Sequence, residues 1–154
     1  MYSRLLPAVT ILLWQTLFAS TGLAGSCLIT LAPSPTFIPP EPYQASPDGG
    51  FWFGTRRLWV RLPIEFTTHQ RQKLFVWSQD YKDPIQESKP ALVVTGRRLD
   101  GDSQPFVAQN ATNAFNFAGG PAMLICITVP ETGCWELTAF YRSATVSFIV
   151  SVDR

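Results

Sequence analysis

Apolar and polar residues alternate along the C-terminal third of the chain. Between positions 135 and 141 every second residue is large and apolar or small and apolar: Trp135, Leu137, Ala139 and Tyr141. The residues between them are polar except Phe140, and the run 146–153 alternates in the same way after a tight connection at 142–144. A period of two is typical of β-strands with one buried face. The pattern therefore predicts a hairpin that buries one face.

Shorter apolar runs precede this hairpin. They cover residues 51–53, 58–62, 74–77, 91–99, 105–107 and 123–129, with prolines and glycines between them. In the run 58–62, Trp59 and Arg61 fall on the face opposite Leu58, Val60 and Leu62. The run 123–129 is apolar on both faces, as expected for a central strand. About seven or eight such runs, with no amphipathic helical pattern, predict an all-β, antiparallel two-sheet β-sandwich over residues 50–154.

The N-terminal residues 1–26 have the pattern of a secretory signal peptide. Arg4 is the only charged residue before Glu41, residues 5–19 are almost entirely apolar, and small residues follow. The uncharged stretch 5–32 is also long enough to span a bilayer, so an uncleaved anchor is the alternative. Either interpretation places the rest of the chain outside the cytoplasm. We expect an exported protein of the cell envelope, membrane-anchored on the extracytoplasmic side. Secretion is the alternative location.

Residues 27–49 form a proline-rich segment between the signal and the domain. Its prolines stand at positions 33, 35, 39, 40, 42 and 47. Prolines favour an extended polyproline II path and remove backbone donors. We expect a semi-rigid tether that holds the domain off a surface.

The three cysteines are Cys27, Cys126 and Cys134, an odd count that requires a separate fate for one in an exported protein. Residues 23–27 (LAGSC) resemble the lipobox of bacterial lipoproteins, although Ala24 stands where the favoured form has Leu. That resemblance implies lipidation of Cys27 and a membrane anchor. Cys126 and Cys134 then form either a disulfide or two buried free thiols. In a hairpin turning at 130–133, residue 126 lies opposite 137, which spaces the two sulfurs widely.

The segment around the last turn carries a family resemblance. Residues 129–138 (VPETGCWELT), followed by SFIVSV, resemble the last strands of immunoglobulin-like domains. Together with GFWFG at 50–54 and the motif from Pro130 to Tyr141, they are similar to a group of uncharacterised exported bacterial (lipo)proteins. The resemblance spans most of residues 50–154. It implies an immunoglobulin-like fold and export, and it implies no activity.

Composition and candidate chemistry narrow the function classes. The net charge is +1 without a clustered basic face, which argues against nucleic acid as a partner. His69 is the only histidine, and neither a nucleophile elbow nor a zinc-ligand spacing is present. Asp100 and Asp102 supply too few oxygens for calcium. We expect no enzyme activity, no metal and no cofactor.

Aromatic residues are the remaining signal, at 13% of the chain. The alternation places Trp135 in the core, whereas Trp52, Trp59, Trp77 and Tyr81 are candidates for exposed, ligand-binding positions. The main expectation is a structural or interaction domain that binds an envelope protein. The alternative is a carbohydrate- or cell-wall-binding module that stacks these aromatic rings on a polysaccharide.

Overall fold

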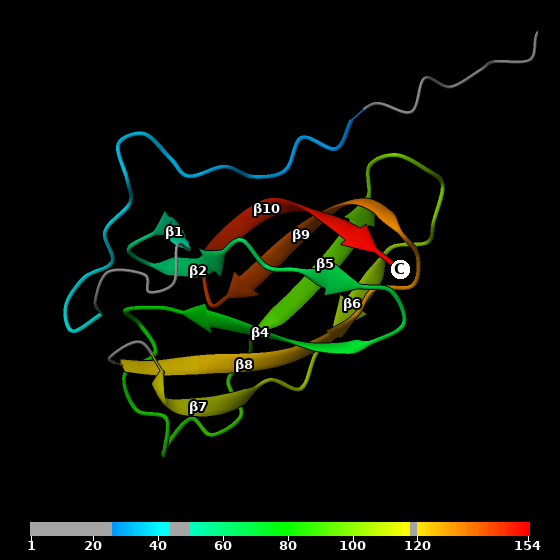
Figure 1. Cartoon of the computed structure of the whole chain (residues 1–154). Helices are drawn as coiled ribbons and strands as arrows, with labels where there is room; N and C mark the ends of the chain where they lie inside the picture. The colour runs from blue at the N-terminus through cyan, green and yellow to red at the C-terminus, as the bar shows by residue number, and fades with distance from the viewer. Residues whose placement is uncertain (1–25, 44–49, 118–119) are drawn as a thin grey trace, which may run out of the picture.

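A computed structural model describes residues 26–43, 50–117 and 120–154, without the side chains of 115–117. Every helix or strand within these ranges is a β-strand, and the strands form two five-stranded sheets packed face to face (Figure 1). The predicted signal peptide lies outside the described residues, apart from Ser26. The structure confirms the all-β sandwich.

Sheet A is antiparallel throughout and has the order β1-β2-β4-β8-β7. Its strands are β1 (Phe51–Thr55), β2 (Leu58–Leu62), β4 (Arg71–Trp77), β7 (Thr112–Phe117) and β8 (Gly120–Thr128). Four of them, in the order β2-β4-β8-β7, correspond to the A-B-E-D sheet of immunoglobulin-like sandwiches.

Sheet B has the order β3-β10-β9-β5-β6. Its strands are β3 (Phe66–Thr67), β5 (Val93–Arg98), β6 (Phe106–Ala108), β9 (Gly133–Tyr141) and β10 (Ala144–Asp153). All pairs are antiparallel except β3 with β10, and the order β10-β9-β5 corresponds to the G-F-C sheet. The immunoglobulin-like strand order thus appears in both sheets.

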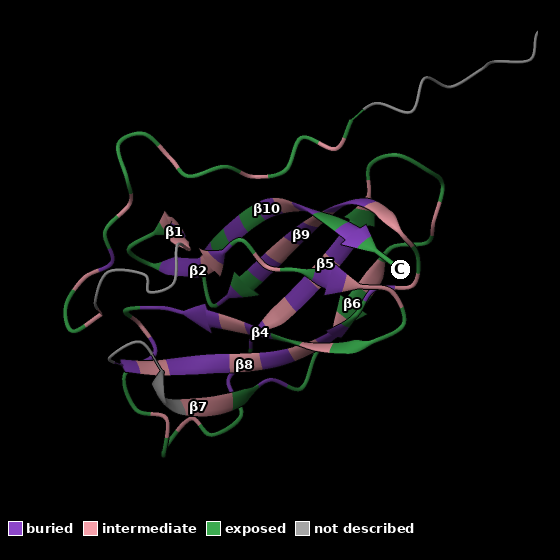
Figure 2. Cartoon of the chain, in the orientation of Figure 1, coloured by how far each residue is buried: buried purple, intermediate pink, exposed green. Residues whose placement is uncertain are grey.

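The core lies between the sheets and follows the alternation seen in the sequence. In the β9–β10 hairpin, Leu137 pairs with Phe148 and Ala139 with Val146, all pointing into the sandwich. Sheet A supplies the opposing layer from β2, β4 and β8: Leu58, Val60, Leu74, Val76, Met123, Ile125 and Ile127. All of these residues are buried, so removal of their apolar surface from water is the main stabilising term. Figure 2 shows buried segments, in purple, on strands of both sheets.

The N-terminal segment, residues 26–43, lies against the sandwich, and we call it the belt. Figure 1 shows it as the blue-to-cyan trace that passes β10 and curves round beyond β1. The amide of Thr30 donates to the Ile149 carbonyl at 3.0 Å, and the Ile149 amide donates to Thr30 Oγ1 at 2.8 Å. The described part of the expected tether is therefore packed on the domain, held by these backbone contacts and by the side chains of Phe37 and Tyr43.

No helix within the described ranges is long and apolar enough to cross a membrane. Most of the apolar stretch that suggested an uncleaved anchor precedes those ranges.

Truncation of a central core residue provides a test of the sandwich. Leu137 is fully buried between the sheets, so Leu137→Ala should lower the free energy of unfolding by about 2–5 kcal/mol through lost burial and a cavity. Urea denaturation measures it. Thr145→Ala, at an exposed position on β10, is the control and should change stability by less than about 0.5 kcal/mol. Equal effects of the two substitutions would contradict the packing.

Candidate functional site

The four aromatic residues predicted to be exposed are buried. Trp52 retains 2% of its accessible surface, Tyr81 1%, and Trp59 and Trp77 none. The prediction of an exposed aromatic, ligand-binding surface is therefore wrong. The alternation had correctly placed Trp59 on the face of β2 that points away from the core, but other residues cover that face.

A second hydrophobic cluster lies on the outer face of sheet A, separate from the core. We call it the outer cluster, and its buried members are Trp52, Trp59, Trp77 and Ala122. The belt residues Phe37 and Tyr43 pack against it, together with Phe75 and Ala114. The Tyr43 ring meets Trp59 edge-on at a centroid distance of 5.0 Å, and Trp52 meets Trp77 in the same way at 4.9 Å. The belt thus excludes water from the tryptophans.

Tyr81 belongs to the core side of the fold. Its ring meets Tyr141 at 6.1 Å, and its hydroxyl donates to the Glu87 carbonyl at 3.1 Å. Burial raises the pKa of Tyr81 to about 12, and the negative charges of Glu87 and Asp83 contribute. Tyr81 therefore holds the chain after β4 in place and is covered from ligands.

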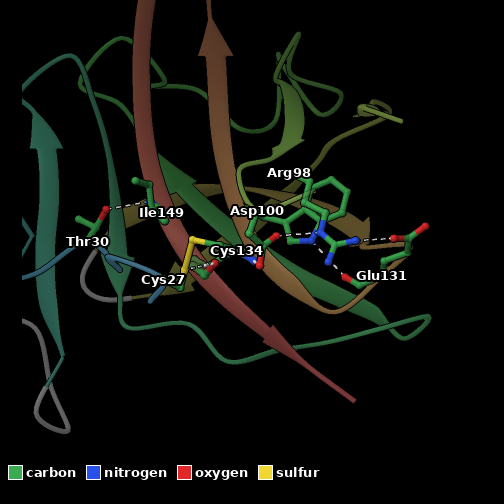
Figure 3. The surroundings of a disulfide bond; sticks show 9 residues. Cys27, Thr30, Arg98, Asp100, Glu131, Cys134 and Ile149 are labelled. Carbon is green, nitrogen blue, oxygen red and sulfur yellow. Dashed lines mark hydrogen bonds and ion pairs between the residues drawn. A yellow bond between two sulfur atoms is a disulfide. The ribbon is translucent and has the colours of Figure 1, made fainter. Parts of the chain in front are cut away.

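The belt is joined covalently to sheet B. Cys27 and Cys134 form a disulfide with a Cα–Cα distance of 5.3 Å and a sequence separation of 107 (Figure 3). Cys126 is a free, half-buried thiol. Ile125 of β8 points into the core, so its neighbour Cys126 lies on the outward face of sheet A. Trp135 of β9 also points into the core, so its neighbour Cys134 lies on the outward face of sheet B. The sandwich therefore separates the two cysteines.

The observed bond contradicts two predictions about the cysteines. The suggested Cys126–Cys134 disulfide is wrong, because the chain between them crosses from one sheet to the other. Lipidation of Cys27 is also contradicted, because a thioether would need the sulfur that bonds Cys134. Sequence reasoning missed the observed pair because it assigned Cys27 to a separate tether. The odd cysteine count was the only signal, and it left the pairing open.

A charged cluster fixes the start of β9 beside the disulfide. Asp100 accepts the amide of Cys134 at 3.0 Å and the Arg98 Nε–H at 2.8 Å (Figure 3). Arg98 Nη1 also donates to Glu131 at 2.6 Å. Gly133 has a φ of 130°, and a Cβ there would lie 2.7 Å from Asp100 Oδ1, so only glycine fits. The Arg98 hydrogen bond lowers the pKa of Asp100.

A second polar cluster fixes the segment 78–90 to the β9–β10 turn. Glu87 accepts hydrogen bonds from the Tyr141 hydroxyl at 2.8 Å and from Arg142 Nη2 at 2.9 Å. Arg142 Nη1 donates to the Asp80 carbonyl at 2.9 Å. Burial, and then the bond to Glu87, raise the pKa of Tyr141. These groups are engaged with one another and hold the loop in place.

His69 lies exposed in the turn between β3 and β4. Its φ of 58° is typical of a tight turn, and its amide donates to the Val129 carbonyl at 3.0 Å. Among the described residues, no group of three or more His, Cys, Asp or Glu side chains is placed to hold a metal ion. The geometry gives His69 a role in the turn.

The outer face of sheet B is the counterpart of the outer cluster, and we call it the open face. Its residues come from β5, β6, β9 and β10: Thr95, Arg97, Val107, Glu136, Thr138, Phe140, Thr145 and Ser147. Phe140 is 41% exposed and Val107 59% exposed. Arg97 pairs with Glu136 at 2.8 Å, and the Thr138 and Ser147 hydroxyls lie 2.9 Å apart. Short side chains around an exposed ring make this face suitable for contact with a macromolecule.

The chain matches no protein-family model, and searches of curated proteins and of solved structures gave no match either. The kind of protein that this chain forms is therefore inferred from its fold and from the surfaces described above.

Removal of the disulfide should destabilise the protein. Cys27→Ser frees a loop of about a hundred residues in the unfolded chain, and a crosslink of that span contributes on the order of 4 kcal/mol. Urea unfolding under non-reducing conditions measures the loss. Cys126→Ser is the matched control and should change stability by less than about 1 kcal/mol. A larger loss in Cys126→Ser than in Cys27→Ser would contradict the pairing.

Asp100 should stabilise the protein at neutral pH and make that stability fall in acid. Its folded pKa is lowered, so its stabilisation is present above the unfolded pKa of about 3.9 and is lost as the pH falls through the folded pKa. Asp100→Asn should lower stability at pH 7 and flatten the decline of the unfolding free energy below about pH 4. Denaturation at a series of pH values measures this. The exposed Asp102→Asn is the control, and an identical curve for both variants would refute the assignment.

Proposed function

We propose that this protein is an exported, non-enzymatic interaction domain of the cell envelope. The observation that carries the proposal is the Cys27–Cys134 disulfide, because disulfides form and persist in oxidising compartments outside the cytoplasm. The signal-like sequence at 1–26 agrees with export. With the Cys27 sulfur engaged, the remaining modes are attachment through an uncleaved N-terminal anchor, or secretion.

Two ionisable groups with shifted pKa values make structural contacts, and this supports a binding role over a catalytic one. The carboxylate of Asp100 and the hydroxyl of Tyr141 have shifted pKa values, which often marks functional groups. Both are occupied by contacts that hold strands and loops together, with Arg98 and Cys134 for Asp100 and with Glu87 for Tyr141. Structural networks produce such shifts as well. We therefore assign these groups to the scaffold.

The open face is the surface we assign to the partner, which we propose to be a protein. Exposed aromatic rings act as anchors at the centre of protein interfaces. Phe140 lies between Val93 and Thr145 on neighbouring strands, and Val107 stands on the edge strand β6, which is separated from β9 by β5. Thr95, Thr138, Thr145 and Ser147 lie on the same face, and short polar side chains beside an exposed ring suit a protein surface better than a small ligand, which is bound in a concave pocket.

Site-specific crosslinking tests the proposal. A photo-reactive phenylalanine analogue at position 140 of the full chain, in an exporting host, should yield a discrete protein adduct in the extracytoplasmic fraction. Val107→Glu places a charge on the same face and should reduce the adduct at least about tenfold, because an unpaired charge in an interface is costly.

The matched control carries the photo-reactive residue at position 85. Ile85 is 76% exposed, and it follows Pro84, whose carbonyl accepts a hydrogen bond from Asn113 on β7 at the edge of sheet A. It should give no adduct of the same mass. The proposal fails if both positions give the same adduct, if Val107→Glu leaves it unchanged, or if the folded protein is found in the cytoplasm.

A further inference from the structure

The belt does not fill the surface that it crosses. A groove of about 190 Å³, open to solvent, lies between Ile29–Thr30 and the edge of the sandwich. A second open groove, of about 510 Å³, lies between residues 33–38 and the β1–β2 turn. A third, of about 390 Å³, lies between residues 40–43 and the start of the segment 78–90. Open grooves along an extended segment are typical of a docked peptide, whereas a core element is close-packed on all sides.

Two aromatic side chains provide the belt's contacts with the outer cluster. Phe37 and Tyr43 meet the same ring, Trp59, at centroid distances of 6.4 and 5.0 Å. The Tyr43 hydroxyl also donates to the Pro121 carbonyl at 3.0 Å. Ile38, between them, is 75% exposed. The belt therefore contacts the cluster through two aromatic rings with the buried Pro39 between them, while Ile38 faces water.

The body of the protein is shaped to receive Tyr43. A Cβ on Gly120 would lie 2.6 Å from Tyr43 Cε1, closer than real contacts allow, so this ring fits only because residue 120 has no side chain. Burial raises the pKa of Tyr43 to about 12. The space that the Tyr43 ring occupies is therefore formed by β8, which is far from the belt in sequence.

The outer cluster also contains a hydrogen-bond donor that is available to a bound peptide. The indole N–H of Trp59 is fully buried and has no hydrogen-bond partner among the residues that the structure describes. A buried donor without a partner is costly, and a peptide carbonyl is the group that satisfies it. The resident belt segment makes ring contacts with Trp59 but leaves this donor unused.

We propose that the outer cluster is a peptide-binding groove for short segments that combine prolines with aromatic residues. Its resident occupant is the chain's own segment 37–43. Aromatic-lined grooves recognise proline-rich segments because the extended polyproline II form is already ordered and packs flat against rings. A tethered occupant competes at about millimolar effective concentration, so the groove is closed to a free peptide while the belt is seated. This site is on sheet A and is independent of the open face on sheet B.

The test combines a belt variant with a free peptide. In the full, disulfide-bonded chain, Phe37→Ala/Tyr43→Ala removes both anchors and should open the groove. A synthetic peptide of residues 33–43 (PSPTFIPPEPY) should then bind saturably, measured by calorimetry and tryptophan fluorescence. Binding to the unmodified protein should be at least about tenfold weaker, because the belt competes.

Three controls make the result specific. Ile38→Ala changes an exposed belt residue and should behave like the unmodified protein. A peptide with alanine at both aromatic positions should not bind. Gly120→Ala, added to the double variant, should weaken peptide binding at least about tenfold, because its Cβ occupies the space of the tyrosine ring.

The inference is overturned if the folded double variant binds no peptide, or binds the alanine peptide equally well. It is also overturned if Gly120→Ala has no effect on binding. Folding is verified by circular dichroism and by mass spectrometry of the disulfide. If the double variant does not fold, Tyr43→Ala alone provides the same measurement.

Discussion

The structure depends on one constraint: sheet A carries large apolar side chains on both faces, and both sets must be shielded from water. The inward face packs on sheet B and forms the core. The outward face carries three tryptophans that sheet B cannot reach. Burial of that much aromatic surface is worth several kcal/mol, so a second covering layer is favoured. The belt is that layer, and the disulfide fixes its far end to the other sheet.

The alternation of residues predicted the fold well because a strand has only two faces. It placed Leu137 in the core and Trp59 on the opposite face of β2, and both placements are correct. Periodicity assigns a residue to a face but does not say what covers that face. The exposure of Trp59 and Trp77 was therefore predicted wrongly, since the covering residues Phe37 and Tyr43 lie in a segment that has no period.

The cysteines show the same limit for long-range contacts. The distance between Cys126 and Cys134 along the chain is short, but the connection between them crosses from sheet A to sheet B. Cys27 and Cys134 are separated by 107 positions, and only the path of the belt around the sandwich brings them together. No local pattern encodes such a path. The open face could have been proposed from the alternation, since Phe140 interrupts the polar side of its strand.

The disulfide also determines how mechanical load passes through the molecule. Tension applied between the N-terminal side of Cys27 and the C-terminus travels through the sulfur bridge into β9. It then runs through residues 134–154 alone, which form the β9–β10 hairpin. The segment between the two cysteines, which includes all of sheet A, lies in a closed covalent loop and carries no load through its own backbone. A domain pulled from its N-terminal end would extend by no more than one hairpin while the bridge remains intact.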